Sequence, residues 1–320
     1  MVNKKVILII GALGQIGTDL TIALRNRFGT ESVIAADLLE VKPDLLKSGP
    51  YIRLNVMDKV AIEDVVTRNK VTEIYHLAAV LSANGEKNTS HTWNINIIGL
   101  MNVLDVAKIF GLKVFWPSSI AIFGPTSPKL LCPQHTVTEP VTVYGITKVA
   151  GEHLCNYYHE QYGVDVRSLR YPGLISYSAK PGGGTTDYAA DIFYHALEKG
   201  SYNCFLKEET TLPMMYMADA IRAVVELMDA PVEKIRIRTS YNISAMSFSP
   251  KNLSAAITKH LPDFHISYKP DARQRIADSW PTTIEYIEAT NDWGWRPKYD
   301  INLMTADMLQ CIANQKNLTI

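Results

Sequence analysis

The chain has 320 residues, and its 32 basic and 32 acidic side chains cancel to a formal net charge of zero. This balance argues against nucleic-acid binding, because nucleic-acid-binding proteins usually carry a surplus of Lys and Arg that neutralises phosphates. A hydrophobic content of 47% with 20% charged residues is ordinary for a globular protein and excludes disorder of the whole chain. The length suits one large domain or two fused domains.

Signals for membranes, disulfides and metals are missing from the sequence. No stretch approaches the ~18 consecutive apolar residues that span a bilayer. The short apolar run at 6–10 leads directly into glycines, so we interpret it as a buried strand and not as a signal peptide. The four cysteines are far apart and form no CxxC pair, which indicates a reducing, cytoplasmic setting. The eight histidines lack zinc-ligand spacing, and we predict no metal site.

Strand-like and helix-like segments alternate through the first half of the chain. Buried strands are predicted where short apolar runs are rich in β-branched residues, at 5–10, 32–36, 51–54, 73–76, 114–116 and 166–171. Helices are predicted where apolar residues recur at helical spacing, at 15–28, 60–68, 99–109 and 152–162. This alternation predicts an α/β fold of Rossmann type, a doubly wound parallel sheet with helices on both faces.

A glycine-rich turn joins the first predicted strand to the first predicted helix. Its sequence is Gly11-Ala12-Leu13-Gly14-Gln15-Ile16-Gly17. Glycines let the backbone turn tightly and approach a pyrophosphate, which the free N–H groups of the helix N-terminus then bind. Asp37 follows at the end of the second predicted strand, where a carboxylate accepts hydrogen bonds from a ribose diol and repels a 2′-phosphate. The pattern predicts NAD as cofactor, in preference to NADP.

A tyrosine and a lysine stand four residues apart and share one face of a helix. They are Tyr144 and Lys148. A nearby ammonium stabilises a phenolate, so we expect Lys148 to lower the pKa of Tyr144 from ~10 toward neutrality. Such a tyrosine can take the proton of an alcohol while hydride leaves its carbon. Ser119 ends the fifth strand, at the edge where α/β sheets bind ligands, and its hydroxyl can donate to the substrate oxygen.

Several segments, in this order along the chain, resemble those of the extended short-chain dehydrogenases/reductases. They are the glycine turn, Asp37, 55–58 (Asn-Val-Met-Asp), 76–79 (His-Leu-Ala-Ala), 96–99 (Asn-Ile-Ile-Gly), 118–124 (Ser-Ser-Ile-Ala-Ile-Phe-Gly) and 144–148 (Tyr-Gly-Ile-Thr-Lys). The late segment 293–297 (Trp-Gly-Trp-Arg-Pro) resembles the C-terminal Gly-Trp-x-Pro of the same group.

Two observations narrow the choice of enzyme class within this group. Sugar-nucleotide epimerases and dehydratases typically have Arg-Tyr-Phe-Asn after the sixth strand, whereas this chain has Arg170-Tyr171-Pro172-Gly173. The segments 117–125 and 181–189 look like those of the short-chain-type L-threonine 3-dehydrogenases. This resemblance implies NAD-dependent oxidation of L-threonine to 2-amino-3-oxobutyrate. It also implies a homodimer, formed through the helices around 99–109 and 147–162.

The resemblance further implies roles for individual residues. Tyr144 is the general base, Lys148 anchors the nicotinamide ribose and Ser119 steadies the alcohol oxygen. The cofactor contacts fall on Gly11, Gly14, Gln15, Ile16, Gly17, Asp37, Val56, Asp58, Leu77, Ala78, Ala79, Tyr144, Lys148, Tyr171, Gly173 and Leu174. The substrate contacts fall on Ser82, Ser119, Tyr144, Thr186 and Trp280, and the glycines at 182–184 suit a moving lid. The role of Asn96 stays open: it could hold a bound water in a proton relay, or it could be structural.

The strict alternation of strands and helices ends near residue 175. We therefore expect residues 1–175 to form the NAD-binding domain and residues 176–320 to form a smaller, mainly substrate-binding region. An amphipathic helix at 217–228 indicates that the segment of about 212–243 returns to the first domain.

Two other functions stay open. A nucleotide-sugar epimerase or dehydratase would have the same fold, although the Asn after the sixth strand is missing. A non-catalytic NAD(H)-binding sensor would keep the glycine turn and would be expected to lose the Tyr–Lys pair, which is present here. The expected partner is a small-molecule substrate, with neither nucleic acid nor membrane.

Overall fold

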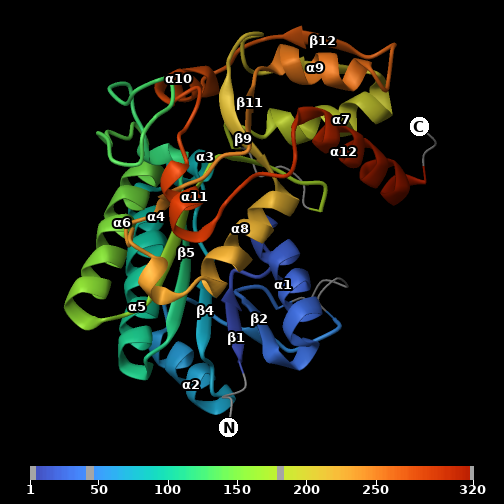
Figure 1. The fold of residues 1–320 in the computed structure, drawn as a ribbon. Helices are drawn as coiled ribbons and strands as arrows, with labels where there is room; N and C mark the ends of the chain where they lie inside the picture. The colour runs from blue at the N-terminus through green and yellow to red at the C-terminus, as the bar shows by residue number, and fades with distance from the viewer. Residues whose placement is uncertain (1–4, 41–46, 179–183, 318–320) are drawn as a thin grey trace. The chain divides into compact units, whose positions relative to one another are not determined.

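The computed structural model describes residues 5–40, 47–178 and 184–317, and the chain divides into two compact units (Figure 1). Unit 1 consists of Met1–Ser119, Thr142–Arg170 and Ile221–Tyr241. Unit 2 consists of Ile120–Val141, Tyr171–Ala220 and Asn242–Ile320. The chain therefore passes between the units more often than a single boundary at 175 implies.

Hydrogen bonds explain why these boundaries differ from the expected ones. The segment after the fifth strand belongs to unit 2, where the Leu131 N–H donates to the Thr283 hydroxyl (2.7 Å) and the Lys129 ammonium to the Trp280 carbonyl (3.1 Å). The returning segment begins at Ile221 and not near 212. Residues 212–216 instead pair within a small sheet of unit 2.

Unit 1 is built on a seven-stranded sheet with the order β10-β6-β5-β4-β1-β2-β3. Its strands are β1 (Ile7–Ile10), β2 (Val33–Asp37), β3 (Tyr51–Arg53), β4 (Glu73–His76), β5 (Lys113–Ser119), β6 (Val166–Tyr171) and the short edge strand β10 (Tyr241–Asn242). β1 pairs in parallel with β2 and β4, so that Ile10 stands opposite both Ala36 and His76. The strand order reverses at β1, and ligands of doubly wound sheets bind in the crevice at such a point.

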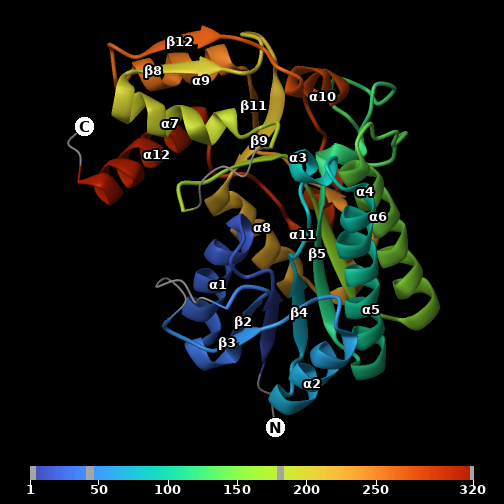
Figure 2. The same cartoon turned by 180° about the vertical axis from the view of Figure 1, so that it is seen from behind.

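Helices cover both faces of this sheet (Figure 2). They are α1 (Gln15–Phe28), α2 (Lys59–Asn69), α3 (Ser82–Gly85), α4 (Thr89–Trp93), α5 (Gly99–Phe110), α6 (Val143–Tyr162) and most of α8 (Met217–Asp229). A π-helical turn, η3 (Asn94–Ile98), joins α4 to α5, and 3₁₀ turns occupy η1 (Thr30–Ser32) and η5 (Val232–Lys234). α2, α5 and α6 lie on one face, while α1 and α8 lie on the other (Figure 1).

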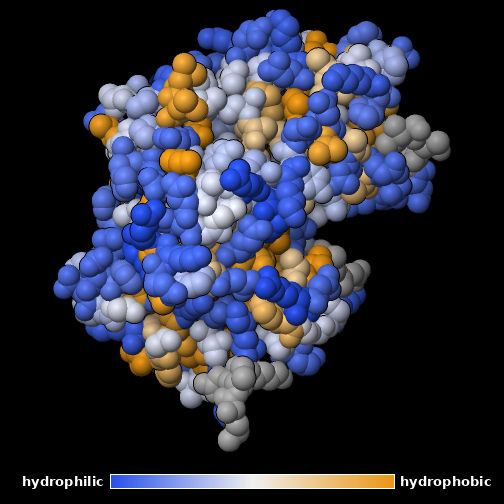
Figure 3. Space-filling view, viewed as in Figure 1, coloured by the Kyte–Doolittle hydropathy of each residue, from blue (hydrophilic) through white to orange (hydrophobic). Residues whose placement is uncertain are grey.

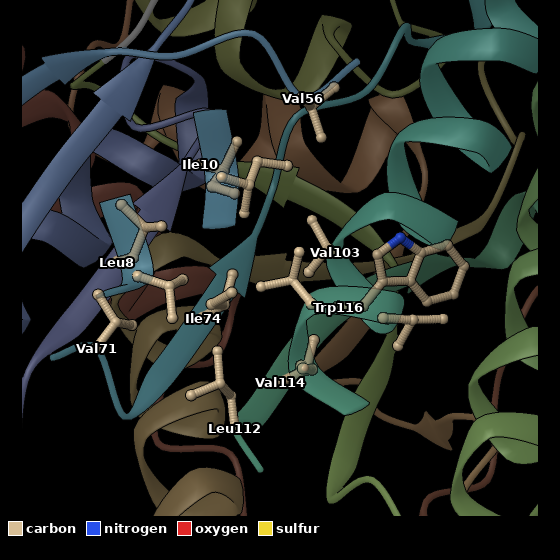
Figure 4. Packing of buried hydrophobic residues seen from close by; sticks show 14 of the residues in the cluster. Leu8, Ile10, Val56, Val71, Ile74, Val103, Leu112, Val114 and Trp116 are labelled. Carbon is tan, nitrogen blue, oxygen red and sulfur yellow. The ribbon is translucent and has the colours of Figure 1, made fainter. Parts of the chain in front are cut away.

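The core of unit 1 fills the layer between the sheet and α2, α5 and α6. Ile74 of β4, and Val114 and Trp116 of β5, point into this layer, as Figure 4 shows. Side chains alternate along a strand, so His76 shares the face of Ile74. α6 approaches the sheet so closely that a Cβ on Gly151 would lie 2.4 Å from the Trp116 ring. This close packing fixes the position of α6 over the end of β5.

Unit 2 contains two small sheets and its own helices. β7 (Gly173–Ile175), β9 (Leu212–Tyr216) and β11 (Met246–Phe248) form a sheet of order β11-β9-β7, and β8 (Ser201–Cys204) pairs in parallel with β12 (His265–Tyr268). The helical elements are η4 (Ile120–Ile122), α7 (Tyr188–Lys199), α9 (Pro250–Thr258), α10 (Arg273–Ser279), α11 (Ile287–Trp293) and α12 (Ile301–Lys316). α7 packs against α9 and α12. Among the described residues, no helix is long and apolar enough to cross a membrane.

Candidate active site

The glycine turn packs against the end of β4 without room for side chains. Gly11 has φ +89°, and a Cβ there would lie 2.6 Å from the Ala78 nitrogen. A Cβ on Gly17 would lie 2.2 Å from the Gly11 carbonyl oxygen. Both positions require glycine for the fold of unit 1 itself.

Gly14 differs from these two glycines. A Cβ on Gly14 would come no closer than 3.4 Å to another part of the protein, and its φ of −74° suits any residue. Gly14 is the N-cap of α1, no side chain caps this helix end, and Gln15 and Ile16 form the first turn. The protein alone does not demand glycine here. Glycine at this position leaves the N-terminus of α1 open to a ligand.

A cavity of about 310 Å³ opens at the ends of β1, β2 and β4. Seven of the predicted cofactor residues line it: Gly11, Gly14, Asp37, Val56, Leu77, Ala78 and Ala79. Seven further lining residues were not predicted: Ile10, Leu38, Leu54, Asn55, Val80, His91 and Ile95. Asn55 directly follows Leu54 after β3 and was visible in the family motif, whereas nothing in the sequence marked His91 or Ile95.

The Asp37 carboxylate lies at this cavity in a fixed orientation. Oδ2 accepts a hydrogen bond from the Leu13 N–H (3.0 Å), and Oδ1 accepts one from the Leu38 N–H (2.8 Å). Each carboxylate oxygen has a second lone pair that can accept from a ligand hydroxyl. Asp37, the cavity and the uncapped end of α1 together fit the adenosine and pyrophosphate of a dinucleotide.

Asp58 follows the cavity residue Val56 by two positions but does not itself line the cavity. Its Oδ1 accepts from the Ala61 N–H (3.0 Å), which makes Asp58 the N-cap of α2. The neighbouring Val56 carbonyl accepts from the Asn102 amide (3.0 Å). The contact of Asp58 with adenine stays a prediction.

Tyr144, Lys148 and Ser119 come together at the carboxyl end of β5. α6 starts at Val143 because the Thr142 hydroxyl caps it, accepting from the Gly145 N–H (3.1 Å). Tyr144 lies in the first turn, is partly exposed and shares a hydrogen bond with the Ser119 hydroxyl. Lys148 lies one turn further along, 3% exposed, and donates to the Pro117 carbonyl (2.6 Å). Its ammonium also lies 4.4 Å from the centre of the Trp116 ring.

Burial has the largest effect on the pKa values of Tyr144 and Lys148. It raises the pKa of Tyr144 to about 12, against the smaller, lowering effect of the Ser119 hydrogen bond. Burial also lowers the pKa of Lys148 to about 7. The expectation that Lys148 lowers the pKa of Tyr144 toward neutrality is therefore wrong for this structure. The low-dielectric setting penalises the phenolate and, by the same effect, weakens the hold of Lys148 on its proton.

Two further buried polar residues lie near this part of α6, His76 close to Lys148 and Asn96 against Thr147. His76 is 1% exposed, and neither ring nitrogen forms a hydrogen bond with the described residues. Burial, and then the charge of Lys148, lower the pKa of His76 to about 3, so the imidazole is neutral. Asn96 is anchored on three sides: its oxygen accepts from the Val80 N–H (2.8 Å), and its amide donates to the Val80 carbonyl (3.1 Å) and the Thr147 hydroxyl (3.0 Å). This favours the structural role for the Asn96 side chain.

The remaining candidate residues lie within their own units. Ser82 begins the short helix α3 of unit 1. In unit 2, Tyr171 donates its hydroxyl to the Ala220 carbonyl (3.0 Å), and Leu174 lies in β7. Gly173 packs against Thr186, whose Cβ would be 2.8 Å from a Cβ added to the glycine.

Trp280 and the glycine segment complete the candidates of unit 2. Trp280 directly follows α10 and is 7% exposed. Residues 182 and 183 of the proposed lid lie outside the described residues. Gly184 is described, and its N–H donates to the Asp187 carboxylate (2.6 Å).

Known proteins resemble this chain over nearly its whole length. Residues 7–244 match the NAD dependent epimerase/dehydratase family. The mitochondrial L-threonine 3-dehydrogenase of Bos taurus is 46% identical, over 96% of this chain and 82% of its own. The holo form of a GalE-like L-threonine dehydrogenase from Cupriavidus necator is 52% identical with a TM-score of 0.94, covering 96% of this chain and 99% of its own.

A third relative is described with its assembly state. It is a monomeric L-threonine 3-dehydrogenase from a metagenome, in its apo form, 48% identical with a TM-score of 0.93 and covering 97% of this chain and 99% of its own. The match to the family model and the likeness to these structures agree with the mostly parallel sheet and flanking helices of unit 1. The chain belongs to the NAD-dependent epimerase/dehydratase family, and its structural relatives include L-threonine 3-dehydrogenases.

Proposed function

We propose that this protein catalyses the NAD-dependent oxidation of L-threonine to 2-amino-3-oxobutyrate, with Tyr144 as the general base. One observation carries the proposal above the others. Ser119, Tyr144 and Lys148 meet at the ligand-binding edge of the sheet, in a chain 52% identical to an L-threonine dehydrogenase. A non-catalytic NAD(H) sensor does not need this group.

The residues around the cavity of unit 1 suit NAD. Asp37 accepts from the adenosine ribose hydroxyls and repels the 2′-phosphate of NADP, while the N-terminus of α1 at Gln15 and Ile16 binds the pyrophosphate. Val56 and Asp58 are proposed for adenine, and Lys148 for the nicotinamide ribose. Backbone groups of Tyr171, Gly173 and Leu174 are proposed for the carboxamide. When bound, NAD supplies the ring carbon that accepts a hydride.

The reaction requires one proton transfer to a residue of this chain. C3 of threonine carries a secondary alcohol and a hydrogen. The alcohol proton passes to the Tyr144 oxygen while the C3–H electron pair leaves as hydride, and the C–O bond becomes the carbonyl of 2-amino-3-oxobutyrate. Ser119 donates to the alcohol oxygen, and the Lys148 ammonium stabilises the Tyr144 phenolate. Because burial makes this phenolate strongly basic, it is a competent acceptor once formed.

The substrate is a small zwitterion with a methyl group. Ser82 and Thr186 are proposed to donate hydrogen bonds to it, Thr186 to the carboxylate, and Trp280 is proposed to pack against the methyl group. Thr186→Ala is expected to raise the Michaelis constant for L-threonine. An unchanged Michaelis constant would remove Thr186 from the substrate contacts.

A homodimer and a cytoplasmic location complete the proposal. Large hydrophobic side chains are exposed on η3, α5 and α6: Ile98, Ile109, Phe110, Ile146, Tyr157 and Tyr162. In Figure 3, hydrophobic residues reach the surface near the end of α5. Such a surface is typical of an interface between subunits, although one close relative is described as monomeric. The widely spaced cysteines, none of them in a disulfide, suit a reducing compartment.

The direct test measures NADH formation from NAD with a panel of substrates. L-threonine, L-allo-threonine, L-serine and a UDP-sugar are each offered at the same concentration. We expect the highest kcat/KM with L-threonine. Epimerisation is redox-neutral and forms no net NADH, so conversion of the UDP-sugar is followed by analysis of the sugar product. Such conversion without turnover of any amino acid would instead support the epimerase alternative. Tight NADH binding without any turnover would support the sensor.

A further inference from the structure

A buried carboxylate lies one helical turn beyond Lys148. Tyr144, Lys148 and Glu152 follow one another at intervals of four residues along α6, so they lie on the same side of this helix. Glu152 is 4% exposed. A carboxylate this deeply buried needs partners, because the loss of hydration would otherwise make its charge costly.

Two strands supply these partners. Arg170 of β6 donates from Nε to Oε1 (2.9 Å) and from Nη2 to Oε2 (2.8 Å), which is the bidentate arrangement of strong Arg–carboxylate pairs. Ser118 of β5 donates its hydroxyl to Oε1 (2.6 Å). Ser118 and Arg170 are themselves buried. The three side chains tie β5, α6 and β6 together in the interior of unit 1.

Each member of this triad is adjacent to a residue of the proposed site. Ser118 precedes Ser119, Glu152 lies one turn from Lys148, and Arg170 precedes Tyr171. We propose that Ser118, Glu152 and Arg170 form a positioning network that orients Ser119 and Lys148 and, through the Glu152 charge, keeps the Lys148 side chain an ammonium. The catalytic meaning of this network rests on the proposed function, whereas its electrostatic effect on Lys148 does not.

The groups that face Lys148 single out Glu152 as the source of negative charge. On α6, Cys155 and Glu152 oppose the burial that lowers the pKa of Lys148. Burial raises the pKa of the Cys155 thiol well above its usual range, so this side chain is neutral at physiological pH. His76, from β4, is neutral. Tyr144, on α6, is uncharged as a phenol, because burial raises its pKa to about 12. Arg170 pairs with Glu152 and is not among the groups that shift the pKa of Lys148.

A matched control lies just outside the other end of β6. Just before β6, the Asp165 carboxylate pairs with Arg167 (2.9 Å) and Arg238 (2.6 Å). Like Glu152, Asp165 joins buried arginines of unit 1. Asp165 is not among the groups that shift the pKa of Lys148. Asp165→Asn therefore disturbs a comparable ion pair without removing charge from beside Lys148.

The test follows Lys148 directly by NMR of the full-length protein labelled at the lysine ε-carbons. The Lys148 resonance is assigned by its absence in Lys148→Met. Glu152→Gln keeps the shape of the side chain and removes its charge, and a lost negative charge lowers the pKa of nearby groups. We expect the Lys148 titration midpoint to fall by about one pH unit in Glu152→Gln. It should stay within about 0.3 units in Asp165→Asn and in the charge-retaining Glu152→Asp.

Two further results are distinguished by the folding of the variant and by the activity of the wild-type protein. If Glu152→Gln does not fold, the double variant Glu152→Gln/Arg170→Gln removes both buried charges, and its Lys148 midpoint should also fall. In active enzyme, the midpoint of the pH–rate profile should shift in the same direction. A Lys148 midpoint that is the same in wild type and in Glu152→Gln, or in the double variant where the single one does not fold, would overturn the proposal and leave a purely structural ion pair. Wild-type protein that titrates as expected but does not oxidise L-threonine would contradict the proposed function alone.

Discussion

Burial acts on Tyr144 and Lys148 in opposite directions, because it penalises the phenolate of one and the ammonium of the other. The pKa of Tyr144 is raised to about 12 and that of Lys148 is lowered to about 7. The two groups interact, so their protons are lost in steps that belong to the pair. The active form holds one proton fewer than the fully protonated pair, with Tyr144 ionised and Lys148 charged.

This proton count predicts the pH dependence of the reaction. As pH falls through about 7, Lys148 gains a proton. The singly protonated pair, which includes the form with Tyr144 ionised and Lys148 charged, is then depleted and the base is lost. The kcat/KM for L-threonine should therefore fall about tenfold per pH unit well below pH 7 and level off above it. The measurement uses L-threonine deuterated at C3 as a control that hydride transfer limits the rate. A profile that is flat from about pH 5.5 to 9, with the isotope effect expressed, would contradict this account.

Asp37 is the residue on which the choice of cofactor depends. In Asp37→Ala the acceptors for the ribose hydroxyls are lost, so the Kd for NAD should rise roughly tenfold to a hundredfold, as expected for hydrogen bonds to a charged group. The preference for NAD over NADP should fall in parallel, because the repelling charge is gone. Fluorescence titration with NADH and NADPH measures both effects. Unchanged affinities for both nucleotides would exclude Asp37 from the cofactor site.

Gly14 and Gly17 are glycines for different physical reasons. Substituting each by alanine tests this difference. In Gly17→Ala the new Cβ meets the Gly11 carbonyl, so the free energy of unfolding should fall by about 1–3 kcal/mol. In Gly14→Ala the protein has room for the methyl group. The stability should change by less than about 1 kcal/mol, while NADH binds at least about tenfold more weakly. Chemical denaturation and NADH titration of both variants test this. Equal losses of stability would contradict the distinction.

Sequence patterns predicted the regular elements of unit 1 closely. The predicted bounds of α1, β4 and β6 are those of the structure. Apolar patterns mark all three, and Gly14 and Gly29 flank α1. α6 begins at Val143, after the Thr142 cap, and so contains Tyr144 and Lys148, which were predicted to share one face of a helix. The π-helical turn η3 and the edge strand β10 had no signal in the sequence.

The candidate site was predictable where local sequence carries the chemistry. The glycine turn, Asp37 and the Tyr144–Lys148 spacing are local patterns, and seven of the predicted cofactor residues line one cavity. The direction of the Tyr144 pKa shift and the Ser118–Glu152–Arg170 network were not predictable. Both depend on how deeply residues from different strands and helices are buried together, which no single stretch of sequence records.

At the scale of the whole molecule, long-range pairing decides which segments share a unit. Residues 120–141 follow β5 directly and still belong to unit 2, because they pair with residues 280–285. Sequence alternation cannot report such pairing, so the expected boundary at 175 was too simple. The assignment of NAD binding to unit 1 and of substrate binding mainly to unit 2 stays a prediction.

The exposed hydrophobic side chains of α5 and α6 predict the assembly state. Light scattering during gel filtration should give twice the 35.7 kDa mass of the chain. Tyr157→Glu places a charge on α6 at a side chain that is 50% exposed, and it should yield monomers, because burying an unpaired charge opposes association. Val60→Glu, at an exposed position on α2, should remain dimeric. Wild-type protein that elutes at the mass of one chain would contradict the dimer.

The most direct test of the central claim compares wild type with Tyr144→Phe in NADH formation from NAD and L-threonine. The variant loses only the phenolic oxygen, so its Kd for NADH should stay within about threefold of wild type. Its kcat should fall by about 10²–10⁴, the usual contribution of a general base. Wild-type turnover of L-threonine together with this loss would support both the substrate and the base. A variant that turns over within about threefold of wild type would contradict Tyr144 as the base, and wild-type protein inactive on L-threonine would contradict the substrate.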